Sequence, residues 1–137
     1  MSTLTIHTDG GARGNPGPSA VGVVFDAEGF HLEHARTIGD ATNNVAEYTG
    51  VLDALEQLPQ IIALQGITSI LFNLDSELVV KQIRREYKVK EPFLQTLHAK
   101  VLQQLSALTI PYQFVHVRRA QNALADKLVN QALDGVL

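Results

Sequence analysis

Hydrophobic and polar positions follow two different periods along the chain, and the change divides it into two parts. In the first 40 residues, apolar and polar positions alternate over 4–9, and 20–26 and 31–38 are predicted as two further strands. This period of two is typical of half-buried strands. The stretch 10–18 is rich in Gly and Pro and predicts a loop. The short links predict an antiparallel meander.

In the rest of the chain, helical periods alternate with apolar strands. Helix-start residues stand at 42–44, and apolar residues then recur at helical spacing: Tyr48, Val51, Leu52, Leu55 and Leu58, with Pro59 marking the expected end. The patterns that follow predict a buried strand at 67–74, helices at 76–86 and 92–105, a strand at 111–117 and a helix at 122–133. Strands that alternate with helices lie parallel. We predict an α/β fold with a mixed five-stranded sheet and helices on both faces, and a single domain over 1–137.

Composition narrows the possible chemistry. The 137 residues include no cysteine, which excludes disulfides, zinc-thiolate sites and thiol nucleophiles. The net charge of −3 is unlike that of proteins that hold nucleic acid mainly by neutralising phosphates, so such binding needs a local patch or metal ions. No apolar run spans a bilayer and no leader segment precedes the first strand, so we expect a cytoplasmic protein.

Four acids occupy unusual positions. Asp9 and Asp75 stand at the ends of two predicted strands, and ligand sites in α/β sheets gather at such strand ends. The two carboxylates can converge there provided that the strands are neighbours. Glu47 and Asp126 lie near the apolar sides of their helices. Converging carboxylates repel one another unless a cation neutralises them. Because all the ligands are oxygen atoms, Mg²⁺ or Mn²⁺ would suit them.

Each acid also has a structural interpretation. Glu47 follows Asn44 at capping-box spacing, and Asp75 stands where it would cap the next helix. Asp126 falls in a first helical turn, where the helix dipole favours an acid, and Asp9 would bond turn amides. Taken singly, these interpretations are as good as a catalytic one. The four acids together favour a metal site.

The segments around the acids resemble, in order, the four motifs of type 1 ribonucleases H. They are Thr8-Asp9-Gly10-Gly11 with Gly14-Asn15-Pro16-Gly17, then Thr42-Asn43-Asn44-Val45-Ala46-Glu47, Asp75-Ser76-Glu77-Leu78-Val79, and Asn122-Ala123-Leu124-Ala125-Asp126. The first two are specific, and together the four cover nearly the whole chain. The predicted order of strands and helices is also that of the ribonuclease H fold.

The resemblance implies hydrolysis of the RNA strand of RNA–DNA hybrids, with 3′-hydroxyl and 5′-phosphate products. It implies that Asp9, Glu47, Asp75 and Asp126 bind two divalent ions, Mg²⁺ or Mn²⁺. One ion would activate the attacking water and the other would stabilise the leaving 3′-oxygen. Double-stranded RNA stays open as a second substrate. We expect a monomer that needs no protein partner.

Further positions carry over from the resemblance as substrate contacts. Asn15, Asn44 and Glu77 match positions that touch the RNA strand near the cut, where the 2′-hydroxyl distinguishes RNA from DNA. Thr42 matches a position that holds a DNA phosphate. Structural interpretations remain for three of them: Asn15 as a turn former, and Thr42 and Asn44 as helix-start residues.

The chain departs from the best-known members before the fourth acid. Many bacterial members have a His in a mobile loop there, but none stands between Val117 and Asp126. His116 is close, yet it falls within a predicted strand. As in shorter-looped relatives, we expect Arg118 or Arg119 to act near the scissile phosphate.

Two other departures concern substrate binding. The chain has no Trp, and in place of a basic, Trp-containing protrusion it offers Lys81, Arg84, Arg85, Lys88 and Lys90. If these residues form a basic face, we expect binding of the hybrid that is weaker than in members with the protrusion and sensitive to salt. The structural alternative is that they are only the solvated face of a helix. Glu77 stands where Gln is common, which predicts looser substrate binding or a changed metal preference.

Three other functions fit parts of the pattern. A catalytically silent nucleic-acid-binding domain on this fold would be expected to lack an acid, whereas all four are present. An exonuclease or Holliday-junction resolvase of the superfamily would keep the acids, but with different motif spacings. A phosphotransferase on an actin-like fold would need a second domain.

Overall fold

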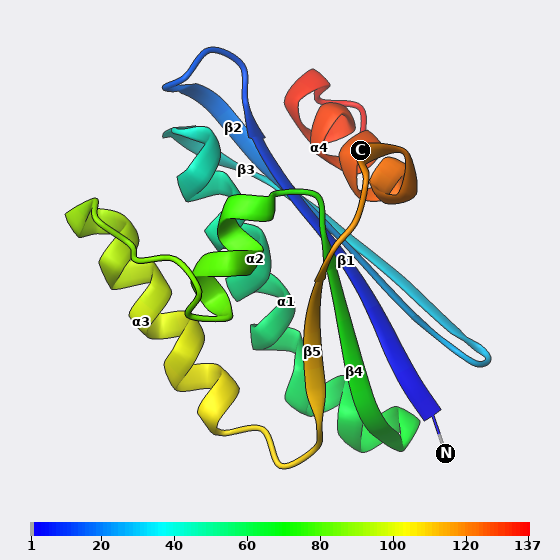
Figure 1. The fold of residues 1–137 in the computed structure, drawn as a ribbon. Coiled ribbons are helices and arrows are strands. Elements are labelled where there is room, and N and C mark those ends of the chain that lie inside the picture. The colour runs from blue at the N-terminus through cyan, green and yellow to red at the C-terminus, as the bar shows by residue number, and fades with distance from the viewer. Residues whose placement is uncertain (1) are drawn as a thin grey trace.

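The fold is built on one sheet that joins the meander to two parallel strands. The computed structural model describes residues 2–137. Its elements are β1 (Ser2–Ala12), β2 (Gly17–Ala27), β3 (Phe30–Ala41), α1 (Asn43–Gln65), β4 (Ile67–Leu74), α2 (Glu77–Ile83), α3 (Pro92–Ser106), β5 (Tyr112–His116), the 3₁₀ helix η1 (Arg119–Asn122) and α4 (Ala123–Asp134) (Figure 1). The strand order is β3-β2-β1-β4-β5, antiparallel for β1–β2 and β2–β3 and parallel for β1–β4 and β4–β5. The predicted mixed five-stranded sheet is confirmed.

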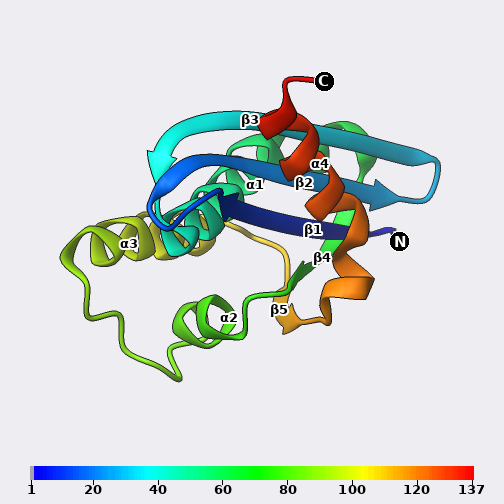
Figure 2. The same ribbon diagram turned by 90° about the horizontal axis from the view of Figure 1, so that it is seen from above.

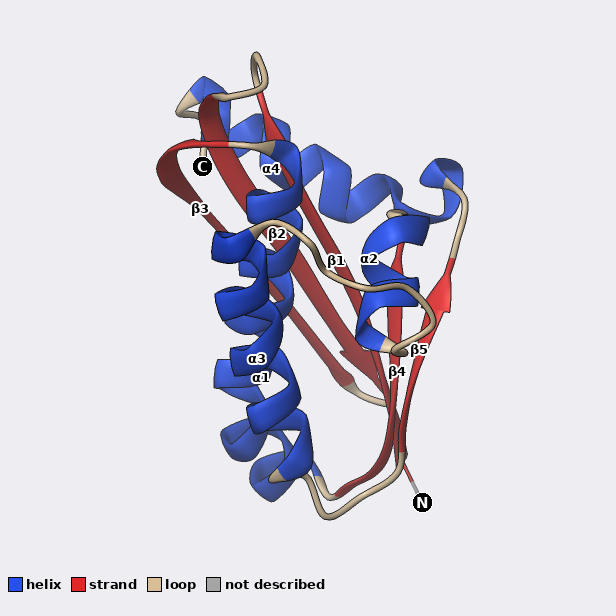
Figure 3. Cartoon of the chain, turned by 60° about the vertical axis from the view of Figure 1, so that its left-hand side comes forward, coloured by secondary structure: helices blue, strands red, loops and turns tan. Residues whose placement is uncertain are grey.

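Helices cover both faces of this sheet. On one face, α1 buries Tyr48 and Val51 against Leu4 and Ile6 of β1 in the main core. Helix α3 lies beside α1 on this face (Figure 3). On the other face, α4 crosses β1, β2 and β3 (Figure 2) and packs Leu128 against the middle of β2. The alternation of strand side chains therefore separates two cores, as the predicted fold class requires.

The Gly-rich segment is less of a loop than we predicted. Pairing between β1 and β2 continues to Ala12↔Ser19, so only residues 13–16 connect the two strands. The glycines misled the prediction because Gly usually weakens a strand. Here Gly10 stays in β1 because a Cβ at this position would overlap the backbone of Ala46 in α1. The glycine marks a close approach of helix and strand rather than a turn.

Helix α1 is longer than predicted. It continues through Pro59 to Gln65, so the end predicted at Pro59 is wrong. The turn after Pro59 buries Ile61 in the core, and Gly66 then ends the helix with a φ of 62°. A left-handed residue of this kind is a common helix stop. None of the helices within residues 2–137 is long and apolar enough to cross a membrane.

Candidate active site

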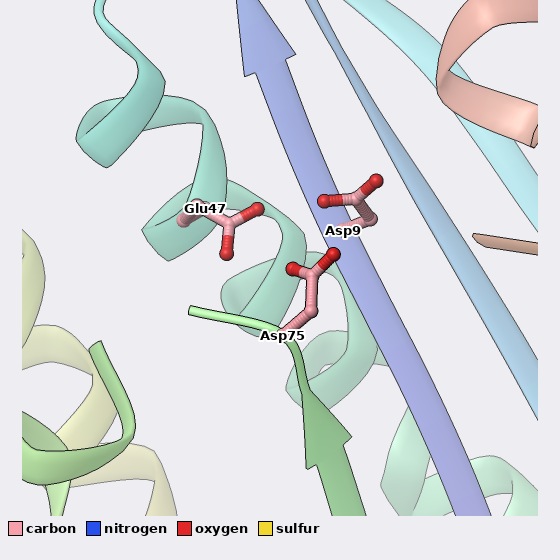
Figure 4. A group of neighbouring side chains, drawn as sticks. All are labelled: Asp9, Glu47 and Asp75. Atoms are coloured by element: carbon pink, nitrogen blue, oxygen red, sulfur yellow. The ribbon is translucent and has the colours of Figure 1, made fainter. Parts of the chain in front are cut away.

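Three carboxylates from three elements converge at one end of the sheet. Asp9 lies in β1, Asp75 directly follows β4, and Glu47 lies in α1. Each offers an oxygen atom, and these oxygens all lie within 4.8 Å of one another (Figure 4). The two strands are parallel neighbours whose pairing ends at Thr8↔Leu74, so Asp9 and Asp75 follow at the same level. This adjacency is the condition that the strand-end argument required.

Glu47 is held against β1 by a shared backbone amide. The N–H of Gly10 donates to Glu47 Oε1 at 2.6 Å and to Asp9 Oδ1 at 2.9 Å. The cap of α1 is Thr42, whose Oγ1 accepts from the N–H of Val45. The predicted capping-box role of Glu47 is therefore wrong, because its side chain points to the strand and not to its own helix start.

Asp75 is also free of a capping role. Ser76 caps α2 by accepting a hydrogen bond from the N–H of Val79, so the predicted cap at Asp75 is wrong. The side chain of Asp75 instead points toward Asp9 and Glu47 (Figure 4). Neither Glu47 nor Asp75 is thus occupied at a helix start, and both are available to a ligand.

The environment of the acids opposes their charge. Burial, with the nearby charges of Asp75 and Asp126, raises the pKa of Asp9 to about 7, although hydrogen bonds offset part of the rise. Burial and the adjacent Asp9 raise the pKa of Glu47 well above its ordinary value. A cation between the carboxylates would reverse both effects, since opposite charge favours the ionised form. The oxygen-only donor set fits a hard divalent ion such as Mg²⁺ or Mn²⁺.

Asp126 faces the same cleft from α4. It lies in the first turn of the helix, as predicted, and is not one of the three acids within 4.8 Å. The helix reaches the sheet here because Gly22, which pairs with Asp9, has no side chain. A Cβ on Gly22 would overlap the carbonyl oxygen of Ala125, one residue before Asp126.

The cleft has a volume of about 420 Å³ and contains all four acids. Its lining is Asp9, Gly10, Gly11, Ala12, Arg13, Asn43, Asn44, Glu47, Asp75, Ser76, Arg119, Asp126, Val129, Asn130 and Leu133. The sequence analysis gave no site role to four polar members: Arg13, Asn43, Ser76 and Asn130. Asn43 and Ser76 stand inside motifs that were recognised, which was the available indication for them, whereas Arg13 and Asn130 lie outside the quoted motifs.

The predicted substrate-contacting residues at the start of α1 also have structural roles. Asn15 Oδ1 accepts a hydrogen bond from the N–H of Asn43 at 3.0 Å, and Asn43 Oδ1 accepts one from the N–H of Ala12 at 2.9 Å. Thr42 is the helix cap. Asn44 lines the cleft. The loop between β1 and β2 is therefore fastened to the start of α1 at the edge of the cleft.

The structure separates the two arginines. Arg119 lines the cleft, its side chain is 84% exposed, and its Nε lies 4.0 Å from Asp75 Oδ2. Arg118 precedes η1 and is not among the cleft residues. Glu77 is likewise outside the lining, where its carboxylate lies 3.8 Å from the ring of His116. Of these predicted residues, the structure brings only Arg119 to the acids.

Comparisons with known proteins agree with this architecture. A family model described as "Reverse transcriptase-like" matches residues 7–132. A bifunctional protein of Mycobacterium tuberculosis is 39% identical over 134 residues, which are 96% of this chain but 35% of that protein. The chain thus spans about a third of the length of this relative. Ribonuclease H of Pseudomonas syringae is 31% identical over 147 residues, covering 98% of this chain and 94% of the relative.

A solved structure gives the same result for the fold. LC11-RNase H1, crystallised in complex with an RNA/DNA hybrid, superimposes with a TM-score of 0.88. It is 44% identical in sequence, with 96% of this chain and 97% of that chain covered. The predicted ribonuclease H-like fold is confirmed. Together with the match to the full-length relative, these findings show that the chain belongs to the type 1 ribonuclease H family of enzymes.

Proposed function

We propose that this chain is an endoribonuclease that hydrolyses the RNA strand of RNA–DNA hybrids with divalent ions held by Asp9, Glu47, Asp75 and Asp126. The main support is the group of three carboxylates within 4.8 Å of one another in a member of this family. Asp126 faces the same cleft from α4 and adds a fourth oxygen ligand. We propose two Mg²⁺ or Mn²⁺ ions and products with 3′-hydroxyl and 5′-phosphate ends.

The donor set supports ions rather than a side-chain base. The pKa values of Asp9 and Glu47 are raised by burial and by neighbouring acids, so the arginines that line the cleft, Arg13 and Arg119, do not neutralise these two carboxylates. When bound, divalent ions supply positive charge that activates water and stabilises the phosphate in hydrolysis. The protein contributes a rigid set of oxygens, because the Gly10 amide fixes Glu47 and Asp9 together. Holding both carboxylates in place before a ligand arrives is the physical role of this arrangement.

Arg119 is the residue that we propose to contact the substrate phosphate. It stands at the mouth of the cleft beside Asp75 and is largely exposed, so its guanidinium is available to a phosphate. An arginine offers several N–H donors in a fixed plane, which suits phosphate oxygens. In this proposal Arg119, and not Arg118, supplies the group that other members obtain from a loop His.

The hybrid substrate is inferred from the relatives. LC11-RNase H1 was solved with an RNA/DNA hybrid, and 97% of that chain is covered. We propose that Thr42 and Asn44, at the start of α1, and Asn15, in the adjoining connection between β1 and β2, lie along the bound hybrid. The net charge of −3 leaves little long-range attraction for nucleic acid, so we expect weak binding. Contacts to phosphates from the basic residues Lys81, Arg84, Arg85, Lys88 and Lys90 would make it weaker still with added salt. We further propose that the described residues act as one domain and as a monomer.

A cleavage assay tests the function. Labelled RNA–DNA hybrid, double-stranded RNA and single-stranded RNA are each incubated with Mg²⁺, Mn²⁺ or EDTA. We expect cleavage of the hybrid in both metals, and none in EDTA or with the Asp75→Asn variant. Cleavage that persists in EDTA would refute the proposal. The double-stranded RNA sample shows whether selectivity extends beyond the hybrid.

A further inference from the structure

Asn122 is a buried polar residue to which the proposed reaction assigns no role. It is 1% exposed and lies where η1 meets α4. Its position suggests a helix cap, but its side chain makes no capping hydrogen bond. Instead, Asn122 Nδ2 donates to the backbone carbonyl of Thr8 in β1 at 2.9 Å. The side chain therefore connects two distant parts of the chain.

Both ends of this hydrogen bond adjoin proposed metal ligands. Thr8 is the last residue of β1 that pairs with β4, and Asp9 follows it directly. Asn122 precedes Asp126 by four residues, which is about one helical turn. One hydrogen bond thus links the residue before Asp9 to the turn before Asp126.

The chemistry of the contact fixes the orientation of the Asn122 amide. The carbonyl oxygen of Thr8 can only accept a hydrogen bond. The Asn122 side chain must therefore face it with its NH₂ group, because its Oδ1 cannot donate. Within residues 2–137, Asn122 Oδ1 has no hydrogen-bond partner. Replacing Asn122 by an apolar residue of similar volume therefore removes this one protein hydrogen bond of the side chain.

Most other contacts between α4 and the sheet are apolar. The polar ones come from Arg13, directly after β1, which reaches Asp134 at 2.7 Å and Asn130 at 3.4 Å in the later part of α4, with exposed side chains. Ala125 and Leu128 pack on Val24, while Val129 packs on Ala20. Apolar burial is roughly proportional to area and has no direction, so it tolerates a small slide of the helix. A hydrogen bond depends on distance and angle. The bond from Asn122 is buried and lies at the start of α4, so it is the directional contact best suited to set the position of the turn that carries Asp126.

We propose that Asn122 is a positioning residue, whose hydrogen bond to Thr8 holds α4 where the Asp126 carboxylate completes the cation site begun by Asp9. This inference rests on the proposed function, because it assumes that Asp126 binds a cation. A residue that supports a ligand in this way commonly changes metal affinity when it is removed. A purely structural residue would change stability alone.

Calorimetric titration with Mn²⁺, without nucleic acid, tests the proposal. We would compare Asn122→Leu and Asn122→Ala with wild type, and repeat both substitutions in an Asp126→Asn background. With Asp126 present, we expect each to weaken Mn²⁺ binding roughly tenfold or more. With Asp126 replaced, we expect the same substitutions to change binding less than about twofold, since residues that act through one another are not additive.

Tyr48→Phe is the matched control. Its hydroxyl donates a buried hydrogen bond to Gln82 Oε1 at 2.7 Å and touches none of the acids. It should lower the melting temperature and leave Mn²⁺ affinity unchanged. Equal losses in both Asp126 backgrounds, or unchanged affinity in folded Asn122→Leu protein, would overturn the role of Asn122 alone. Absence of Mn²⁺ binding by wild type would instead refute the cation site, and this proposal with it.

Discussion

Helix α1 buries two acids, Glu47 and Asp53, in opposite electrostatic surroundings. Each is 7% exposed. Glu47 faces Asp9 and Asp75, and its pKa is raised by burial and by these charges. Asp53 faces β3, where Arg36 donates from Nε at 2.7 Å and from Nη2 at 2.9 Å, and His34 Nε2 lies 2.9 Å away. Burial opposes the charge of Asp53 too, but these partners outweigh it and its pKa is lowered.

The comparison shows how a structural role can be distinguished from a ligand-binding role for a buried acid. Asp53 has its counter-charge within the chain, so it fastens β3 to α1 and needs nothing else. Glu47 has other acids, and not a counter-charge, as its neighbours. This arrangement costs free energy in the absence of a cation. Burial of a carboxylate is therefore uninformative until its partners are known. The predictions below exchange or remove those partners.

The largest effect is expected for activity at Glu47. Glu47→Gln keeps the shape of the side chain but removes a charged ligand, so we expect hybrid cleavage to fall by about three orders of magnitude. Single-turnover rates on a labelled hybrid would measure this. Asp53→Asn is the control on the same helix and should keep a near-normal rate at low temperature. Similar rates for both variants would remove the distinction between the two acids.

The next largest effect concerns the partner of Asp53. Arg36→Met removes the bidentate hydrogen bonds and leaves a buried charge with only His34, so we expect a loss of about 2 kcal/mol in the free energy of unfolding. Denaturant titration measures it. The double variant Arg36→Met/Asp53→Leu also removes the buried carboxylate, so it should recover part of the lost stability. If Arg36→Met were neutral, Asp53 would not depend on this partner.

Removing an acid from the active site should stabilise the metal-free protein. The pKa of Asp9 is raised to about 7, so its ionisation costs stability as pH rises from 3.8 through 7. Asp9→Asn removes that cost, and we expect roughly 1–2 kcal/mol of added stability at pH 8 in EDTA. Thermal melts in EDTA and in Mg²⁺ would test this. Mg²⁺ should raise the melting temperature of wild type but not of Asp9→Asn.

The smallest effect is a pH dependence at Asp53. Because its folded pKa lies below the ordinary 3.8, its stabilising contribution is present above pH 3.8 and is lost as pH falls through the lowered value. The difference in unfolding free energy between wild type and Asp53→Asn should therefore be constant near neutrality and shrink in acid. Denaturant titrations from pH 7 to below pH 3.8 would show it. A difference that grows in acid would contradict the assignment.

The sequence predicted the framework well because periodicity reports which face of each element is buried. It placed Asp9 and Asp75 at strand ends, where ligand sites gather, and the structure adds that these two parallel strands are neighbours. The sequence-based prediction failed at two residues whose local preference is outweighed by a contact between distant elements. Gly10 was assigned to a loop, although the missing Cβ serves the approach of α1. Pro59 was assigned to a helix end, although core burial of Ile61 continues the helix.

The roles of Asp53 and of the two arginines before α4 could not be predicted from the sequence. The importance of Asp53 depends on Arg36, 17 residues earlier, and on a strand-to-helix contact that no local pattern encodes. The choice between Arg118 and Arg119 depends on η1, a short turn that points only one of them at Asp75. Such contacts follow from the packed structure, which a single sequence does not specify position by position.

The dispersal of the four acids along the chain affects how the enzyme is made. Asp9 is synthesised with β1, the first described strand, whereas Asp126 follows only with α4, the last described helix. Domains generally fold from the N-terminus as they are synthesised, and contacts distant in sequence form late. A partly translated chain therefore has an incomplete cleft. The cleft is complete only after α4 has been synthesised and has packed on the sheet.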